Sequence, residues 1–212
     1  MKKIAAIAAL TLATSAQAGV ITSTAALNLE TTEINQSLSL NQFDSSLGTL
    51  TGVDITLFGQ GVSAATVQNT AAQAQTFKFE STLDLLFSGP ALSSVVSIPL
   101  FATGFVNIAS QATLDLGSVN LSDQATVSIA AADFAAFVGA GTIGLGCQSF
   151  VSNTQTGGGG NIVVTQNTQA GCGAQVTYTF ADAPPPSSVP EPGTLAMAGL
   201  GLLGLGAMRR RK

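Results

Sequence analysis

Hydrophobic and polar residues alternate over several stretches in the middle of the chain. Val53, Ile55 and Leu57 are separated by Asp54 and Thr56, and the same period of two recurs in the segments TFKFES (76–81) and AQVTYTF (174–180). This period is typical of antiparallel strands with one buried face. Gly and Asn clusters punctuate the segments, as in folds of many short strands. The pattern predicts an all-β fold, an antiparallel β-sandwich of jelly-roll type.

Two segments interrupt this pattern. The alanine-rich run SIAAADFAAFV (128–138) favours a short helix. Four glycines, 157–160, predict the tip of a long hairpin with legs at 142–155 and 161–176.

The chain contains two cysteines, Cys147 and Cys172, which lie toward the base of that expected hairpin. In an exported protein such a pair most simply forms a disulfide, closing a loop of about 25 residues and stabilising the fold by roughly 3 kcal/mol. A free pair or a metal site is the alternative, but two Cys and no His cannot complete a typical zinc shell.

The amino terminus has the order of parts of a secretory signal peptide. Lys2 and Lys3 precede an apolar run (4–13), and Ala16-Gln17-Ala18 is a small-x-small cleavage site that leaves Gly19 first. An amphipathic or buried helix is the competing interpretation. We therefore expect a signal helix over 1–18 and a β-domain over 19–180.

The carboxyl terminus has a second ordered arrangement. A Pro-rich linker (181–193) precedes fifteen uncharged residues (194–208) and then the basic end Arg209, Arg210, Arg211 and Lys212. A helix of fifteen residues spans roughly 22 Å, less than a hydrocarbon core of about 30 Å. The segment 194–212 is thus expected to be a short apolar helix that tethers the chain to the membrane only temporarily.

Charge is distributed unevenly between the ends and the middle. Between Glu30 and Asp182 the chain has ten of its eleven acidic residues and one basic residue, Lys78, a net charge of −9. Such a surface repels phosphate backbones, which excludes nucleic acid as a partner. Divalent cations or cationic polymers are compatible with it, and solubility alone also accounts for it.

The candidate chemistry is sparse. The chain has no His, which excludes Ser-His and Cys-His catalysis and His-ligated metals. Two G-x-G-x-x-G matches, 139–144 and 199–204, lack the βαβ context of a dinucleotide site. Asp115, Asn120 and Asp123 offer oxygen ligands for calcium but without EF-hand spacing. We expect no enzyme activity, no cofactor and no metal. A hydrolase would need two carboxylates close together, and nothing in the sequence distinguishes such a pair.

Val189, Pro190, Glu191 and Pro192, followed by the apolar run and the arginines, resemble the PEP-CTERM sorting signal of Gram-negative bacteria. The resemblance implies that signal peptidase and then exosortase, a membrane-embedded transpeptidase, process the chain. It also implies transient membrane contact through 194–208, and a final place on the cell surface or in the exopolysaccharide matrix of a biofilm.

A second resemblance covers the β-domain. The segments 42–57, 139–144 and 176–180 are similar to the choice-of-anchor E domain, which has no assigned biochemical function. The residues of the first segment themselves predict a turn at Asp44, Ser45, Ser46 and Gly48, with Phe43 and Leu47 pointing into the core. Together the two resemblances imply an exported structural protein of the surface or matrix. The alternative is a carbohydrate-binding module that takes exopolysaccharide.

Overall fold

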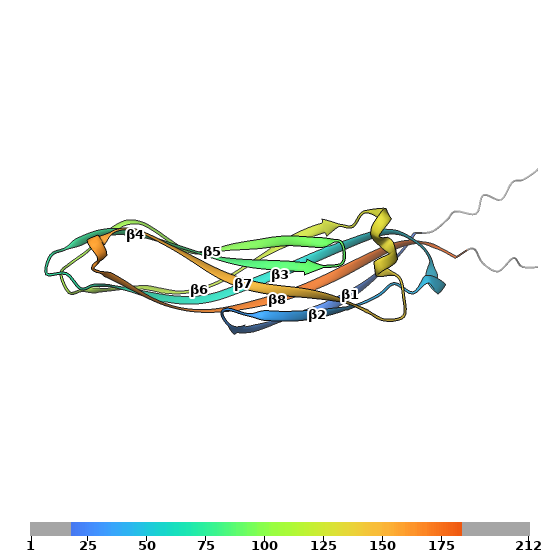
Figure 1. The fold of residues 1–212 in the computed structure, drawn as a ribbon, viewed down its shortest axis with the longest axis horizontal. Coiled ribbons are helices and arrows are strands. Elements are labelled where there is room, and N and C mark those ends of the chain that lie inside the picture. Colours follow the sequence, from blue (N-terminus) through green and yellow to red (C-terminus); the bar gives the residue numbers. More distant parts are fainter. Residues whose placement is uncertain (1–17, 184–212) are drawn as a thin grey trace, which may run out of the picture.

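A computed structural model describes residues 18–183 as eight strands in two four-stranded antiparallel sheets (Figure 1). Sheet A has the order β1 (Ala18–Thr31), β8 (Ile162–Asp182), β3 (Gly48–Asn69) and β6 (Thr113–Ser128). Sheet B has the order β2 (Asn35–Asn41), β7 (Thr142–Gly157), β4 (Gln75–Gly89) and β5 (Leu92–Ile108). The expectation of an all-β, two-sheet antiparallel fold is confirmed. The expected terminal helices, 1–18 and 194–212, fall outside the described residues except for Ala18, which begins β1.

The sheets are long and narrow. Strand β3 has 22 residues and β8 has 21, which at about 3.3 Å per residue corresponds to roughly 70 Å. Only β4 and β5 are consecutive strands of one sheet; every other connection between the described strands passes to the opposite sheet. The domain is therefore a rod of two layers, and the chain crosses repeatedly from one layer to the other.

The alternating segments occupy the positions that their period predicts. Val53, Ile55 and Leu57 of β3 are almost fully buried, and so are Phe77 and Phe79 of β4. On β8 the buried positions are Val176, Tyr178 and Phe180. Side chains of both sheets meet in one apolar core between the layers.

The disulfide is confirmed, but the hairpin that was expected to contain it is wrong. Cys147 and Cys172 are bonded, with their Cα atoms 6.5 Å apart. Strand β7 pairs with β2 and β4, whereas β8 pairs with β1 and β3. The turn at 157–160 therefore carries the chain from one sheet to the other, and the disulfide joins the two layers rather than two paired legs.

Two further local expectations need correction. The expected helix over 128–138 is a 3₁₀ helix, η2 (Ala131–Phe137), which buries only Phe137. The expected turn after Phe43 exists as a 3₁₀ helix, η1 (Ser45–Leu47), capped by the Asp44 side chain, which accepts from the Ser46 amide at 2.9 Å. Phe43 is buried as predicted, but Leu47 is 40% exposed, because a single turn at the end of the sandwich has no opposite layer to cover it.

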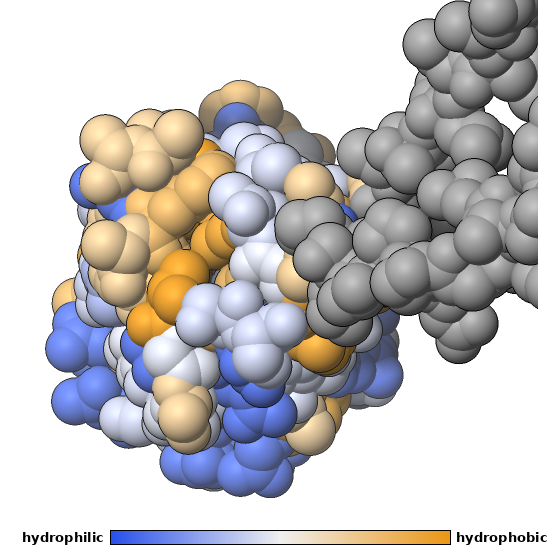
Figure 2. All heavy atoms as spheres, turned by 90° about the vertical axis from the view of Figure 1, so that its right-hand side faces the viewer, coloured by the Kyte–Doolittle hydropathy of each residue, from blue (hydrophilic) through white to orange (hydrophobic). Residues whose placement is uncertain are grey.

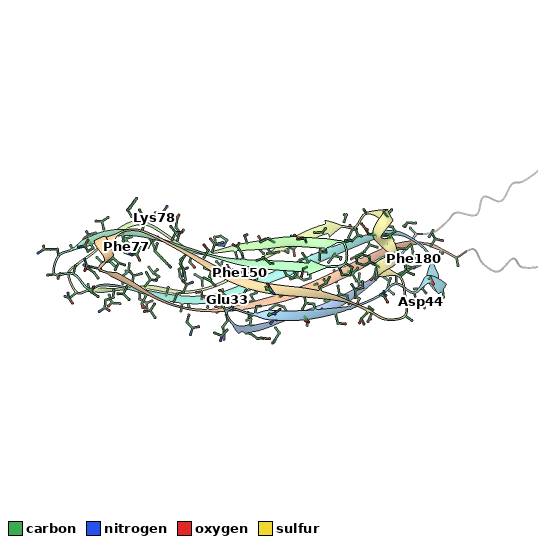
Figure 3. The ribbon with its side chains drawn as sticks, viewed as in Figure 1. Glu33, Asp44, Phe77, Lys78, Phe150 and Phe180 are labelled. Carbon is green, nitrogen blue, oxygen red and sulfur yellow. A yellow bond between two sulfur atoms is a disulfide. The ribbon has the colours of Figure 1, made fainter. Side chains whose placement is uncertain are left out.

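Both ends of the domain lie at the same end of the rod. Ala18 on β1 pairs with Ala181 on β8, and Gly48, which begins β3, pairs with Asp182. In Figure 3, Asp44 and Phe180 mark this end, Glu33 lies near the middle, and Phe77 and Lys78 lie toward the opposite end. We call the end with Ala18 and Asp182 the proximal end and the opposite one the distal end.

Strands β1 and β2 reach only part of the way along the rod. Strand β1 covers β8 as far as Gln169, and β2 covers β7 as far as Gln148. Toward the distal end each sheet is therefore three strands wide among the described residues.

Candidate functional site

The predicted processing sites attach at the proximal end. Ala18 and Gly19 begin β1, where Gly19 pairs with Phe180. Ala16, the Val189–Pro192 motif and the basic end 209–212 fall outside the described residues. Figure 2 looks at the proximal end, where hydrophobic and hydrophilic residues occupy different parts of the visible surface. The segments that would be processed thus join the domain at one place.

The acidic side chains do not converge. Within residues 18–183 no group of three Asp, Glu, Cys or His side chains is arranged to hold a metal ion. The carboxylates that could be compared with a hydrolase pair have separate partners: Asp84 accepts from Ser97, Asp54 from Ser128 and Asp115 from the Gly117 amide. Each makes its own surface or turn contact, and no two of the three share a partner.

The candidate calcium ligands on β6 point in different directions. Asn120 and Asp123 are three residues apart on one strand, so their side chains project from opposite faces. Asn120 accepts from Gln60 on β3, and Asp123 accepts from the adjacent Gln124 amide. The structure does not bring the three oxygen donors together.

The first glycine motif also has a structural role. Gly139 and Gly141 lie against Gln42, which donates to the Ala136 carbonyl at 3.1 Å and accepts from the Gly141 amide at 3.2 Å. The segment leads into strand β7 rather than into a helix. This is not the geometry of a phosphate-binding loop.

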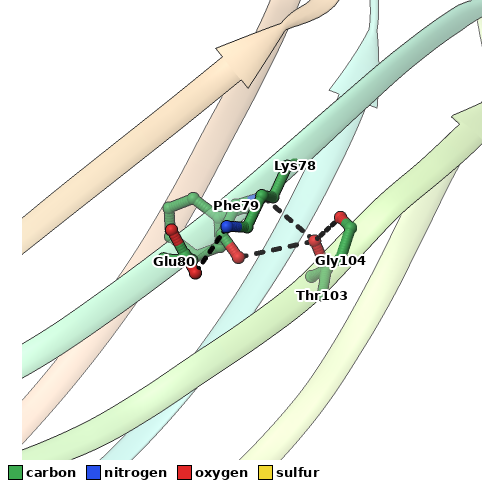
Figure 4. Close-up of polar contacts among 5 residues, drawn as sticks. All are labelled: Lys78, Phe79, Glu80, Thr103 and Gly104. Carbon is green, nitrogen blue, oxygen red and sulfur yellow. Dashed lines mark hydrogen bonds and ion pairs between the residues drawn. The ribbon is translucent and has the colours of Figure 1, made fainter.

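One ion pair occurs among the described residues. Lys78 and Glu80 on β4 meet at 2.8 Å, with both side chains partly exposed (Figure 4). Beside them β5 bulges at Thr103 and Gly104, and the Thr103 hydroxyl accepts from the Phe79 amide at 3.0 Å (Figure 4). The hydroxyl replaces the strand carbonyl that the bulge displaces.

The buried polar groups serve the fold. The Tyr178 hydroxyl donates to the Asn41 carbonyl at 2.8 Å and so links the two sheets. Burial raises the pKa of Tyr178 to about 12. Farther along the rod, the Gln166 amide nitrogen lies within hydrogen-bond distance of the hydroxyls of Ser63, Ser81 and Thr168, at 3.0, 2.9 and 3.2 Å. Among residues 18–183 every buried side-chain nitrogen and oxygen atom has a partner.

Apolar side chains are exposed on the outer face of sheet B. Leu86 on β4 faces Val95 on β5, and these side chains are 38% and 52% exposed. Phe150 on β7 faces the neighbouring Asp84 position and is 47% exposed (Figure 3). Phe105, at 68%, faces Lys78 farther along the same sheet. The alternating sequence pattern did not predict that these exposed side chains lie near one another, because their proximity depends on the order of strands in the sheet.

Comparison with solved structures gives weak likenesses, with thirteen chains matching. A chain of infectious bursal disease virus, Gx strain, is 14% identical, with a TM-score of 0.25 over 85% of this chain and 43% of that one. A chain of the T13 particle of the same virus is 10% identical, with a TM-score of 0.20 over 84% and 44%. The chain spans less than half the length of these viral chains. No curated protein matches.

No helix within residues 18–183 is long and apolar enough to cross a membrane. The informative match lies at the carboxyl end, where residues 188–212 fit the PEP-CTERM protein-sorting motif. The predicted motif residues, from Val189 to Pro192, and the basic end are all inside this match. The chain therefore carries the PEP-CTERM sorting signal of exported proteins that exosortase processes at the membrane.

Proposed function

We propose that this protein is a non-enzymatic structural component of the cell surface or extracellular matrix, tethered by its tail until exosortase processes it. The observation that supports this function is the pairing of Ala18 with Ala181, which puts both domain ends at the proximal end. A tail that leaves from this end holds the rod by its base and presents the distal end outward. A rod of linked layers with a buried disulfide suits an extracellular environment.

The finer points of the fold belong to the same proposal. The strand orders β1-β8-β3-β6 and β2-β7-β4-β5, with nearly every connection crossing between sheets, support a jelly roll. The relation to the choice-of-anchor E domain stays a prediction from the sequence.

Intact mass and location in the native host test the function. We expect the surface or matrix fraction to contain a chain that begins at Gly19 and lacks the basic end, and a strain without exosortase to retain the full tail in its membrane fraction. A replacement of Pro190, Glu191 and Pro192 by Ala should do the same, while Ser187→Ala, outside the matched motif, serves as the control. A surface chain that retains Arg209–Lys212 would contradict the proposal.

A second candidate is a module that binds exopolysaccharide. The exposed Phe150 and Phe105 on the outer face of sheet B favour it, because aromatic faces stack on sugar rings. Loss of polysaccharide pull-down in Phe150→Ala and Phe105→Ala, with Val20→Ala on sheet A as the matched control, would support this candidate. Absence of binding by the unaltered protein across matrix polymers would reject it.

A further inference from the structure

Among the described residues, strand β8 has one edge that is uncovered over part of its length. Strand β1 stops at Thr31, opposite Gln169, and Thr32 then donates to the Thr168 carbonyl at 3.1 Å before the chain crosses to sheet B. Beyond this point β8 is paired only on its β3 side among the described residues. We call the uncovered stretch, Ile162–Thr168, the open edge.

The open edge offers a regular row of backbone groups. In an antiparallel strand the N–H and C=O of one residue point to the same side, and the side alternates along the strand. Since the Thr168 carbonyl points toward β1, the corresponding groups of Ile162, Val164 and Gln166 also point away from β3. The register with β3 is uninterrupted over this stretch, so the row is straight enough to receive another strand.

The other outer strands have features that discourage such pairing. Strand β6 has a bulge at Gly117 and carries Asp115 and Asp123. Strand β5 contains Pro99 and two register shifts. Strand β1 has a register shift after Ala25, and β2 has only 7 residues. Bulges, charges, proline and short length are the usual means of protecting a sheet edge.

The open edge is as short as β2, but it has no bulge, no charge and no proline. Its sequence, IVVTQNT, contains no charge, no proline and no glycine, and it begins with four β-branched residues. That composition favours strand pairing. The free edge of β7 (Ser149–Gly157) is also regular, but its residues are mainly Ser, Asn, Thr and Gln, and it ends in glycine.

The distribution of charge favours a second copy of this chain as the partner. The domain as a whole is strongly acidic, yet the part of sheet A around the open edge (63–69, 113–119 and 162–168) contains one charged residue, Asp115, two strands away on β6. Two copies can therefore approach here with the least like-charge repulsion.

We propose that two copies pair antiparallel through their open edges, about a two-fold axis at Val164. Val164 then faces Val164 of the second copy, and Ile162 faces Gln166, which gives about six new backbone hydrogen bonds. Val163 faces Thr165 of the second copy on the outer surface. The paired strand of the second copy ends in its glycine turn opposite Thr168, which is where β1 begins to cover β8. Each copy therefore adds a fourth strand to the distal, three-stranded part of the other copy's sheet A.

In this antiparallel pairing the proximal ends of the two copies point in opposite directions. If the tail presents the rod as proposed above, copies held on facing surfaces can pair through their distal ends. The dimer itself does not depend on that tether, so its failure and the failure of the surface role are separable.

Charge exchange across the two-fold axis tests the pairing. We expect the exported protein to show, by light scattering after size exclusion, twice the mass of one chain at high concentration. Val163→Lys with Thr165→Lys places like charges opposite each other and should raise the dissociation constant more than about ten-fold. Val163→Lys with Thr165→Glu changes the same positions but pairs opposite charges, and should restore the dimer.

Cysteine pairs give a second measurement that needs no stable equilibrium dimer. Val163 and Thr165 of the second copy form a non-hydrogen-bonded pair, with Cα atoms about 4.5 Å apart. Val163→Cys with Thr165→Cys should therefore yield a covalent dimer on oxidation. Val163→Cys with Asn167→Cys should yield much less, because Asn167 lies two residues away from the position that faces Val163. A single-chain mass at every concentration, equal cross-linking by both pairs, or a dimer that tolerates the two-lysine variant would overturn the proposal. The last result would point to the β7 edge instead.

Discussion

Gly19 lies directly over the ring of Phe180. A Cβ atom built on Gly19 would come within 2.3 Å of that ring. Phe180 in turn packs on Phe43, with ring centroids 5.2 Å apart. The first residue after the expected signal-peptide cleavage therefore completes the proximal end of the core.

Gly19→Ala should lower the free energy of unfolding by about 1–3 kcal/mol, because the ring of Phe180 must shift within a packed cluster. Denaturant unfolding of the exported protein measures the loss. Gly144→Ala is the matched control, since a Cβ there meets no atom within 4 Å. Equal stability of the two variants would contradict the proposed packing.

Replacing Cys147 and Cys172 together by Ala should lower the free energy of unfolding by roughly 3 kcal/mol, through the larger entropy of the unfolded chain. Denaturant unfolding of the variant and of the reduced unaltered protein should give similar midpoints. Because the bond joins two sheets that share a common core, we expect the native fold to persist without it. Loss of β-structure in the unstressed variant would show instead that the bond is required for folding.

Gln166→Ala should cost about 1–3 kcal/mol, since Ser81, which is 1% exposed, loses its partner. Gln166→Ala combined with Ser81→Ala removes both polar partners and should be less destabilising than the sum of the two single changes. Thermal unfolding of the four proteins of the cycle gives the coupling energy. A coupling near zero would mean that the contact adds no stability.

Stability should fall at high pH because of Tyr178. Its folded pKa of about 12 lies above the ordinary value of 10.0, so the folded state holds a proton that the unfolded state has released. The stabilising effect is complete below about pH 10 and is lost as the pH rises toward 12, with a slope that approaches about 1.4 kcal/mol per pH unit. Tyr178 is the chain's single tyrosine, so ultraviolet titration reports it alone, and Tyr178→Phe should remove this slope. An ordinary tyrosine titration in the folded protein would refute the expectation.

The sequence predicts the buried and exposed faces of a strand better than it predicts which strands pair with one another. The period of two correctly assigns Val53, Ile55 and Leu57 to the core, since a strand's faces follow from its own residues. The same period could not show that β7 and β8 lie in different sheets, because a glycine turn serves a hairpin and a crossing between layers equally well. The cysteine pair was predicted, although the elements it joins were not.

The exposed apolar face of sheet B and the open edge could not be predicted from local sequence for the same reason. Phe150, Leu86 and Val95 gather only because β7, β4 and β5 are neighbours. The open edge exists only because β1 ends before β8 does. The sorting signal, by contrast, is linear and could be identified without any fold.

Strand β8 is both the strand with the open edge and the strand that leads to the tail. When the tail is held and the distal end is pulled, tension can pass from Ile162 to Asp182 along one covalent backbone. The hydrogen bonds to β3 and β1 run across that direction and would be loaded together in shear rather than broken one after another. A pull along the axis of the rod would therefore be resisted by all of these hydrogen bonds at once.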